Sequence, residues 1–478
     1  MDPQSKKPRP GDGSVLGEAM ADDKHFVRAL VGLGDAMPLV STEPIRDADG
    51  AKVFDAGCLV DSRLYASLAG RLLAKPLDAC VKAARPARRE DLWLEGREAM
   101  STERFYRMLS HDRSARDSIK ESFGEMRFPE RVALRLSMAK ESMPALYAGC
   151  VRRALVCAYL AHMLGWTPKQ IAAAAATGFA LDLGMLHVDP SLLATRRRLT
   201  GPERRHVFAH PLISMICAKD AGMSEEQCDA VAQHHERLDG GGYPMGLGAE
   251  RLGTLSRIAQ LASAAVGMLE RSQGQKCEQL HLALRLNASH FDRHLSRFLM
   301  EPIERALAED RLAVAPSKSL EQGTLSGRSQ EALSQLEAAV ELVDQWSGAV
   351  EAALANGADA KAMQPFYDVD QRMMAFRQSL AEAGVFGDQL SLLGAVDDES
   401  EVSELERLGA EAGWQMASMG HEAARRWPEW SVDPQSVRAR CWLDAIETSA
   451  RPRGAPTPDG SESKQANPLL AAEPIVGA

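Results

Sequence analysis

Apolar and polar residues follow a helical period over most of the chain. From about residue 131 to 307 apolar residues recur at helical spacing, as they do between Val151 and Leu164. Gly165 is a typical helix end, and Thr167-Pro168 is a common N-cap and first-turn pair for a following helix. We therefore expect a main domain built from helices over this stretch.

The N-terminal part has a less regular pattern. Apolar positions from Phe26 to about Ala84 follow no single period, and Ile45–Phe54 reads as a short hairpin around the Asp49-Gly50 turn. Residues 85–129 are charged and helical in character. The pattern predicts a small α+β subdomain joined by a helical connector to the main domain.

The C-terminal part contains three amphipathic stretches, at 330–354, 367–384 and 401–426. Their apolar stripes are most simply a core, which predicts a helical hairpin or small bundle. The fold class expected for the whole chain is therefore mainly α.

Changes in composition divide the chain into segments. Proline, glycine and serine are frequent at both ends and around Pro316, Gly323 and Gly327, as is typical of disordered ends and linkers. The expected segments are a disordered N-terminus (1–22), a small subdomain with its connector (23–130), the main helical domain (131–310), a linker (311–328), an acidic helical region (329–450) and a disordered tail (451–478).

Composition restricts the classes of function. The eight cysteines form no CxxC pair, which suits a reducing compartment, and no run approaches the roughly 18 apolar residues of a membrane span. We therefore expect a cytoplasmic protein without disulfides. Residues 351–450 hold 8 Lys and Arg against 18 Asp and Glu, which argues against a nucleic-acid polymer as partner.

Three histidines stand out as candidate metal ligands. His210, His234 and His235 lie within about 25 residues, and adjacent residues on a helix are about 100° apart, so both members of the pair can reach one cleft. The isolated histidines have no such context and are expected to be ordinary core or surface side chains: His187, His206, His290 and His294.

The segment from His234 to Pro244 resembles a family signature. It reads His-His-Glu-Arg-Leu-Asp-Gly-Gly-Gly-Tyr-Pro and matches, at every fixed position, the HHExxDGxGYP signature of the bacterial HD-GYP phosphohydrolases. Further matches are Leu199-Thr200, His210-Pro211, Gly246-Leu247, Arg257-Ile258 and Phe291-Asp292. The resemblance covers about 150 to 180 residues. It implies an HD-superfamily helical bundle that hydrolyses cyclic di-GMP at two or three metal ions, commonly iron or manganese.

Counting the family's ligands against this chain shows losses. The family's His-Asp pair falls on Leu181-Asp182, and the lysine that ends that motif is Met185. The upstream histidine falls on Gly149 and the last aspartate on Ser263. Of the four residues that form the family's core metal site, this alignment retains only Asp182.

The family's second metal site keeps its ligands here. Asp182, the residual metal-bridging position, and the three histidines His210, His234 and His235 would suit one divalent transition metal such as iron, manganese or zinc. A chain that binds no metal is the other outcome.

The glycine-rich part of the signature is a candidate contact loop. Its candidate residues are Arg237, Asp239, Gly240, Gly242, Tyr243 and Pro244. In the family a similar loop contacts diguanylate cyclase-type domains, whereas its residues alone are equally typical of a tight turn. Arg237 and Arg257 are candidates for a phosphate contact.

Three hypotheses for function follow. The first is an HD-GYP-like signalling protein, impaired in catalysis, that binds cyclic di-GMP, a related nucleotide or a protein partner, since losing one metal of a pair raises the barrier by several kcal/mol. The alternative is an active phosphodiesterase with an atypical metal centre, to which Asp189, His187 or Glu203 contribute. The residual hypothesis is a helical scaffold.

Overall fold

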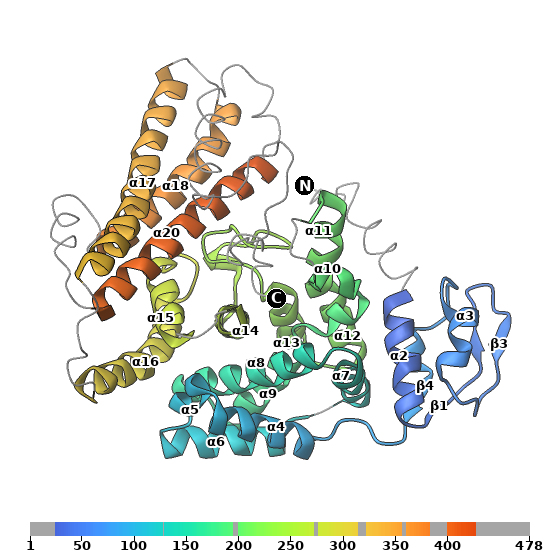
Figure 1. Ribbon diagram of the computed structural model, residues 1–478. Helices are drawn as coiled ribbons and strands as arrows, with labels where there is room; N and C mark the ends of the chain where they lie inside the picture. Colours follow the sequence, from blue (N-terminus) through green and yellow to red (C-terminus); the bar gives the residue numbers. More distant parts are fainter. Residues whose placement is uncertain are drawn as a thin grey trace, which may run out of the picture. The chain divides into compact units, whose positions relative to one another are not determined.

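A computed structural model of the chain describes residues 24–127, 129–194, 199–271, 276–313, 322–355, 360–382 and 399–426 (Figure 1). The disordered ends expected at 1–22 and 451–478 lie outside these residues. The described chain is mainly helical, which confirms the expected fold class. None of its helices is both long enough and apolar enough to cross a membrane.

The N-terminal subdomain combines helices with two small antiparallel sheets. Its elements are α2 (Lys24–Ala36), β1 (Leu39–Ser41), β2 (Ile45–Arg46), β3 (Lys52–Phe54), η1 (Ser62–Leu64), α3 (Tyr65–Leu68), η2 (Leu77–Ala79) and β4 (Val81–Ala83). β1 pairs with β4, and β2 pairs with β3 in the expected hairpin. Gly50 has a φ of 82° in its turn, a conformation that glycine adopts without strain.

Buried contacts join this subdomain to the main domain. Phe26 of α2 stacks on His187 with ring centroids 4.4 Å apart. The buried carboxylate of Asp78 in η2 accepts hydrogen bonds of 2.8 Å from both Arg131 and Arg135. The Arg135 guanidinium also lies 2.9 Å from Nε2 of His187. The subdomain therefore packs directly against the segment that follows Asp182.

The main domain is a bundle of helices. Its elements are α4 (Arg89–Thr102), α5 (Arg104–Leu109), α6 (Arg113–Glu125), α7 (Glu130–Ser142), α8 (Pro144–Met163), α9 (Pro168–Ala180), η3 (Leu183–His187), α10 (Pro190–Ala194), α11 (Gly201–Phe208), α12 (His210–Asp220), α13 (Glu225–Gln233), η4 (Ala249–Arg251) and α14 (Thr254–Arg271).

The buried helix α8 lies at the centre of this bundle. Almost every residue from Gly149 to Ala161 is buried, because α8 packs against α6, α7, α9 and α14. Its end is as the sequence predicts: Gly165 has a φ of 72°, and the hydroxyl and amide of Thr167 both donate to the Gln170 side chain at the start of α9. Residues on several faces of α8 therefore contribute to the core of the main domain.

The C-terminal helices form a second compact unit with their own core. The helices are α15 (Lys276–Leu286), α17 (Gln322–Ala355), α18 (Ala360–Glu382) and α20 (Glu399–Arg426), and α16 (Arg293–Ala313) belongs partly to each unit. Trp346, Leu336 and Leu380 are among the fully buried residues of this core. The three amphipathic stretches are helices, as expected.

Two segments lie close to the expected boundaries. Leu282 and Leu286 of α15 pack into the core of the C-terminal unit, although α15 lies within the range expected for the main domain, 131–310. Helix α17 begins at Gln322, so the end of the expected linker at 311–328 is helical. A single glycine lowers helix stability by only about 1 kcal/mol, which allows Gly323 and Gly327 inside α17.

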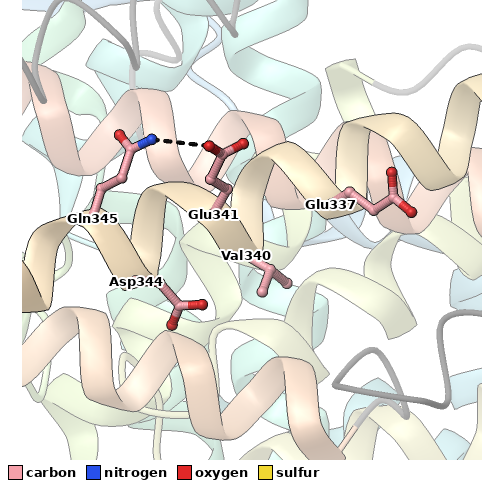
Figure 2. A pocket seen from close by; sticks show the side chains of 5 residues that line it. All are labelled: Glu337, Val340, Glu341, Asp344 and Gln345. Carbon is pink, nitrogen blue, oxygen red and sulfur yellow. Dashed lines mark hydrogen bonds between the residues drawn. The ribbon is translucent and has the colours of Figure 1, made fainter.

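A shallow pocket on α17 shows the acidic character of this unit (Figure 2). It is lined by Glu337, Val340, Glu341, Asp344 and Gln345. The Gln345 amide donates to the Glu341 carboxylate at 3.2 Å. The polar residues that line the pocket provide carboxylates and one amide, so the pocket does not suit an anionic ligand such as a nucleotide.

Candidate metal centre

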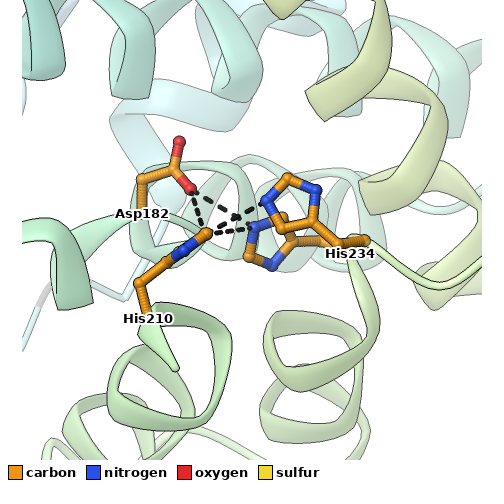
Figure 3. A group of neighbouring side chains, drawn as sticks. Asp182, His210 and His234 are labelled. Atoms are coloured by element: carbon orange, nitrogen blue, oxygen red, sulfur yellow. Dashed lines mark hydrogen bonds and ion pairs between the residues drawn. The ribbon is translucent and has the colours of Figure 1, made fainter. Parts of the chain in front are cut away.

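The four residues predicted as metal ligands come together in the main domain (Figure 3). Asp182 follows the end of α9, His210 begins α12, and His234 and His235 follow the end of α13. One potential ligand atom of each lies within 4.8 Å of those of the others, and all four residues are buried. Elements far apart in the sequence thus deliver one carboxylate and three imidazoles to one point.

Close backbone packing holds η3, which follows Asp182, against α12, which begins at His210. The amide of Gly184 in η3 donates to the Ser214 hydroxyl of α12 at 2.8 Å. A Cβ atom at position 184 would overlap the backbone carbonyl of His210. Because glycine allows this approach, η3 and α12 hold Asp182 and His210 side by side.

Hydrogen bonds to backbone carbonyls fix which nitrogen of two histidines carries the proton. Nδ1 of His210 lies 2.8 Å from the Val207 oxygen, and Nδ1 of His234 lies 2.6 Å from the Val231 oxygen. A carbonyl oxygen can only accept, so Nδ1 is protonated in both rings and each Nε2 presents a lone pair. Carbonyl partners of this kind are typical of metal-ligating histidines.

These lone pairs face other acceptors. Nε2 of His210 lies 3.3 Å from Nε2 of His234 and 3.1 Å from Nε2 of His235. Oδ1 of Asp182 is 3.2 Å from Nε2 of His210 and has no hydrogen-bond donor among the described residues. Buried acceptors without donors are unfavourable, and a cation between them removes the penalty. The donor set therefore fits one divalent metal ion.

Burial and the charge of Arg153 keep three of the ligands in the protonation states that a metal requires. Burial lowers the pKa of His234 and lowers that of His235 well below the usual value, where the neighbouring histidines add to the effect. Burial alone would raise the pKa of Asp182, but the charge of Arg153 holds it well below its usual range. Neutral imidazoles and an ionised carboxylate are the forms that bind metal.

Arg153 is a member of the site that the sequence analysis missed. It projects from α8, its side chain is 3% exposed, and its Nη2 lies 2.8 Å from Oδ2 of Asp182. A signal was present in the sequence, because Arg153 precedes the apolar run from Ala154 to Ala161 in a helix that is almost wholly buried. No position of the family signature marks it.

The three positions predicted to have lost ligands are all buried. Gly149 lies in α8, Leu181 at the end of α9 and Ser263 in α14, so they offer at most one hydroxyl oxygen. Met185, at the position of the family's lysine, packs in an apolar cluster with Val188 and Val207.

The residues considered as replacement ligands have other partners. Asp189 accepts from the amide of Ser191 at 2.9 Å, and Glu203 accepts from the amide of Thr200 at 2.8 Å. His187 lies between Phe26 and Arg135, as described above. None of the three belongs to the group of four ligand atoms within the described residues.

Glu236 and Tyr243 of the signature loop face inward. The Glu236 carboxylate accepts hydrogen bonds from the amides of Met245, Gly246 and Leu247, at 2.6, 3.1 and 2.8 Å. Tyr243 stacks between Phe208 and His235, with ring centroids 4.2 and 4.7 Å away. The loop therefore closes over the histidines and helps to orient His235.

The two arginines considered for a phosphate contact hold the same loop. Arg237 pairs with Asp239 at 2.5 Å, and Arg257 donates to the backbone oxygens of Leu252 and Ala249 at 3.0 and 2.7 Å. Gly242 and Tyr243 are buried, while Met245 is 48% exposed. A protein contact at this loop stays a prediction, and Met245 is the side chain best placed to make it.

We expect Glu236→Ala to lower the free energy of unfolding by about 3 kcal/mol, because it leaves three backbone amides, including that of the buried Leu247, without their acceptor. Urea unfolding followed by circular dichroism measures this change. Glu250→Ala is the matched control, since Glu250 is an exposed glutamate beside the same loop. Equal effects of the two substitutions would contradict the role given to Glu236.

Comparisons with known proteins agree with this geometry. Residues 134–295 match a family model described as HD domain. The chain is 24% identical to a 3'3'-cGAMP-specific phosphodiesterase of Vibrio cholerae over 248 residues, which are 51% of this chain and 55% of that protein. A cyclic di-GMP phosphodiesterase of Pseudomonas aeruginosa is 28% identical over 148 residues, 30% of this chain and 36% of its own length.

A third relative matches a shorter region. A cyclic di-GMP phosphodiesterase of Borreliella burgdorferi is 33% identical over 82 residues, which are 17% of this chain and 22% of that protein. The matched regions thus span about half, or less, of the length of each relative. The family-model match over residues 134–295 includes all four residues of the ligand cluster.

Proposed function

We propose that this chain is an HD-GYP-like signalling protein that binds a cyclic dinucleotide or a protein partner and has little or no hydrolytic activity. The match of residues 134–295 to the HD domain family model supports this proposal. One divalent transition metal, iron, manganese or zinc, would be held by Asp182, His210, His234 and His235. None of the described cysteines belongs to a disulfide, which fits a cytoplasmic location.

The observation that carries the proposal is the composition of the ligand cluster. It contains enough donors for one ion, and the positions that would supply a second ion read Gly149, Leu181 and Ser263. When bound, a metal ion of this kind supplies a Lewis acid for phosphate oxygens. Cleavage of a phosphodiester by two metals needs both ions, so a site for one ion lacks several kcal/mol of transition-state stabilisation.

Burial of the ligands supports the same conclusion. The side chains of His210 and His234 are 0% exposed and that of Asp182 is 1% exposed. Tyr243 and the loop held by Glu236 lie over His235. A phosphate group could reach this cluster only if the loop moved. A metal ion held here would therefore stabilise the domain rather than contact a substrate.

The alternative function is an active phosphodiesterase with one metal ion. Two observations favour it: the complete set of four ligands, and the phosphodiesterase names of the relatives. The relatives also suggest the ligand class, cyclic di-GMP or 3'3'-cGAMP. A diguanylate cyclase-type domain at the loop containing Met245 is a further candidate partner, and a helical scaffold remains the residual hypothesis.

Nucleotide turnover and binding separate these functions. The protein is loaded with Mn²⁺ or Fe²⁺ and incubated with cyclic di-GMP or 3'3'-cGAMP, and the products are separated by chromatography. We expect no more linear dinucleotide than the His234→Ala variant produces. Turnover that depends on His234 would support the alternative. Calorimetry then tests binding, and a chain that binds neither nucleotide at micromolar concentration would leave a protein partner or a scaffold.

A further inference from the structure

We infer that the guanidinium of Arg153 is a built-in cation that takes the place of a second metal ion beside Asp182. The inference rests on the proposed site for one metal and deepens it. It identifies the positive charge that balances the Asp182 carboxylate at the place where ligands for a second metal ion are missing. Arg153 is a positioning residue in this account: it acts through Asp182.

The two oxygens of Asp182 face two different partners. Oδ1 points toward Nε2 of His210 and of His234, at 3.2 and 3.3 Å. Oδ2 pairs with Nη2 of Arg153 at 2.8 Å. One carboxylate therefore bridges the metal position and a guanidinium, where the resemblance implies a carboxylate that bridges two metal ions.

A second carboxylate lies close to the same guanidinium. Nη1 of Arg153 is 2.5 Å, and Oε1 of Glu270 is 3.1 Å, from the position that a Cβ atom would take at Gly149. A guanidinium is protonated throughout the pH range in which proteins are folded. The cation thus lies near two carboxylates, as a metal ion at this place would.

Gly149 is the position of the lost histidine, and its missing side chain is what makes room for Arg153. Any side chain there would overlap the Arg153 guanidinium unless Arg153 moved. A histidine at 149 and the observed position of Arg153 are therefore mutually exclusive. The absence of a side chain at Gly149 is therefore what lets the Arg153 guanidinium reach Asp182.

The backbone of Arg153 is fixed as closely as its side chain. A Cβ atom at Gly178 of α9 would lie 2.6 to 2.9 Å from backbone atoms of Ala154 and Arg153. Helices α8 and α9 are thus in direct backbone contact beside Arg153, and Asp182 follows α9 by two residues. This packing fixes the backbone position from which the Arg153 side chain reaches Asp182.

The replacement has a chemical consequence. A guanidinium holds Asp182 ionised and oriented, but it has no open coordination position and cannot bind and activate a water molecule. It therefore preserves the electrostatic balance of the site without preserving the chemistry of a metal pair.

Substitutions at Gly149 test the coupling without any metal. Alanine stabilises a helix interior relative to glycine, and Gly32→Ala in α2 is the matched control because no atom lies within 4 Å of the added Cβ. We expect Gly32→Ala to raise the melting temperature in every background. Gly149→Ala should lower it in the wild type but not in an Arg153→Met background, where the added methyl group has space.

Two thermal results would overturn the inference. One is a rise in melting temperature for Gly149→Ala in the wild type equal to that for Gly32→Ala. The other is the same shift for Gly149→Ala with and without Arg153. If Arg153→Met does not fold, the comparison of Gly149→Ala with Gly32→Ala in the wild type decides alone.

Metal titration tests the replacement itself. We expect the wild type to bind one equivalent of Mn²⁺ per chain at saturation, measured by elemental analysis after gel filtration. Two equivalents would overturn the inference, because a second ion would then bind despite Arg153. No bound metal would contradict the proposed function instead, and the sign of the Gly149→Ala shift would still decide whether Arg153 needs the space at Gly149.

Discussion

His234→Ala is expected to weaken binding of a divalent transition metal by at least about 100-fold, because changes to the outer partners of metal ligands alone weaken binding 10- to 100-fold. Nε2 of His234 lies 3.3 Å both from Oδ1 of Asp182 and from Nε2 of His210, so its removal deletes one of four converging donors. Competition titration with a chromophoric chelator, using Zn²⁺ or Co²⁺, measures the dissociation constant.

His206→Ala is the matched control for this prediction. His206 lies on α11 of the same domain but outside the group of four ligands. We expect its substitution to change metal affinity less than twofold. Equal affinities for the wild type, His206→Ala and His234→Ala would show that His234 is not a ligand.

Asp78→Asn is expected to lower the free energy of unfolding by about 3 to 5 kcal/mol, because it leaves a buried arginine without its carboxylate. Asp78 has a side chain 0% exposed and pairs with Arg135, whose side chain is 5% exposed. Urea unfolding at neutral pH measures the loss. Glu130→Gln is the control, since the exposed pair of Glu130 and Lys82 should contribute less than about 1 kcal/mol.

The same substitution should change the pH dependence of stability. Burial alone would raise the pKa of Asp78, but Arg135 and Arg131 lower it below its usual value. A lowered pKa gives stability that is present above the unfolded-state pKa of about 3.9 and is lost as the pH falls through the folded-state pKa. The wild type should lose this contribution below about pH 4, and Asp78→Asn should not. Parallel pH profiles would contradict this role for the ionised carboxylate.

The ligand cluster could be predicted from the sequence because a signature names its members. Asp182, His210, His234 and His235 occupy signature positions, and the structure brings their ligand atoms together. The replacement at Arg153 could not be predicted in this way, because it depends on which side chain fills the space left at Gly149. That is a question of packing between α8, α9 and α14, and no local pattern records it.

For the loop and the domain boundary, too, the sequence predicts the local structure but not how it packs. The HHExxDGxGYP pattern indicates the turn, but the inward direction of Tyr243 follows from the amides bound by Glu236 and the stacking on His235. Similarly, the helical period of α15 is visible in the sequence. Which core receives Leu282 and Leu286 is decided by contacts with α18 and α20, more than 70 residues away.

The central claim is that this domain holds one metal ion and no second one. The most direct test is the number of transition-metal ions per chain in protein purified and then saturated with Mn²⁺, Fe²⁺ or Zn²⁺, measured by elemental analysis. The account predicts one ion for the wild type and less than one for His234→Ala at the same metal concentration. Two or more ions per wild-type chain would contradict it.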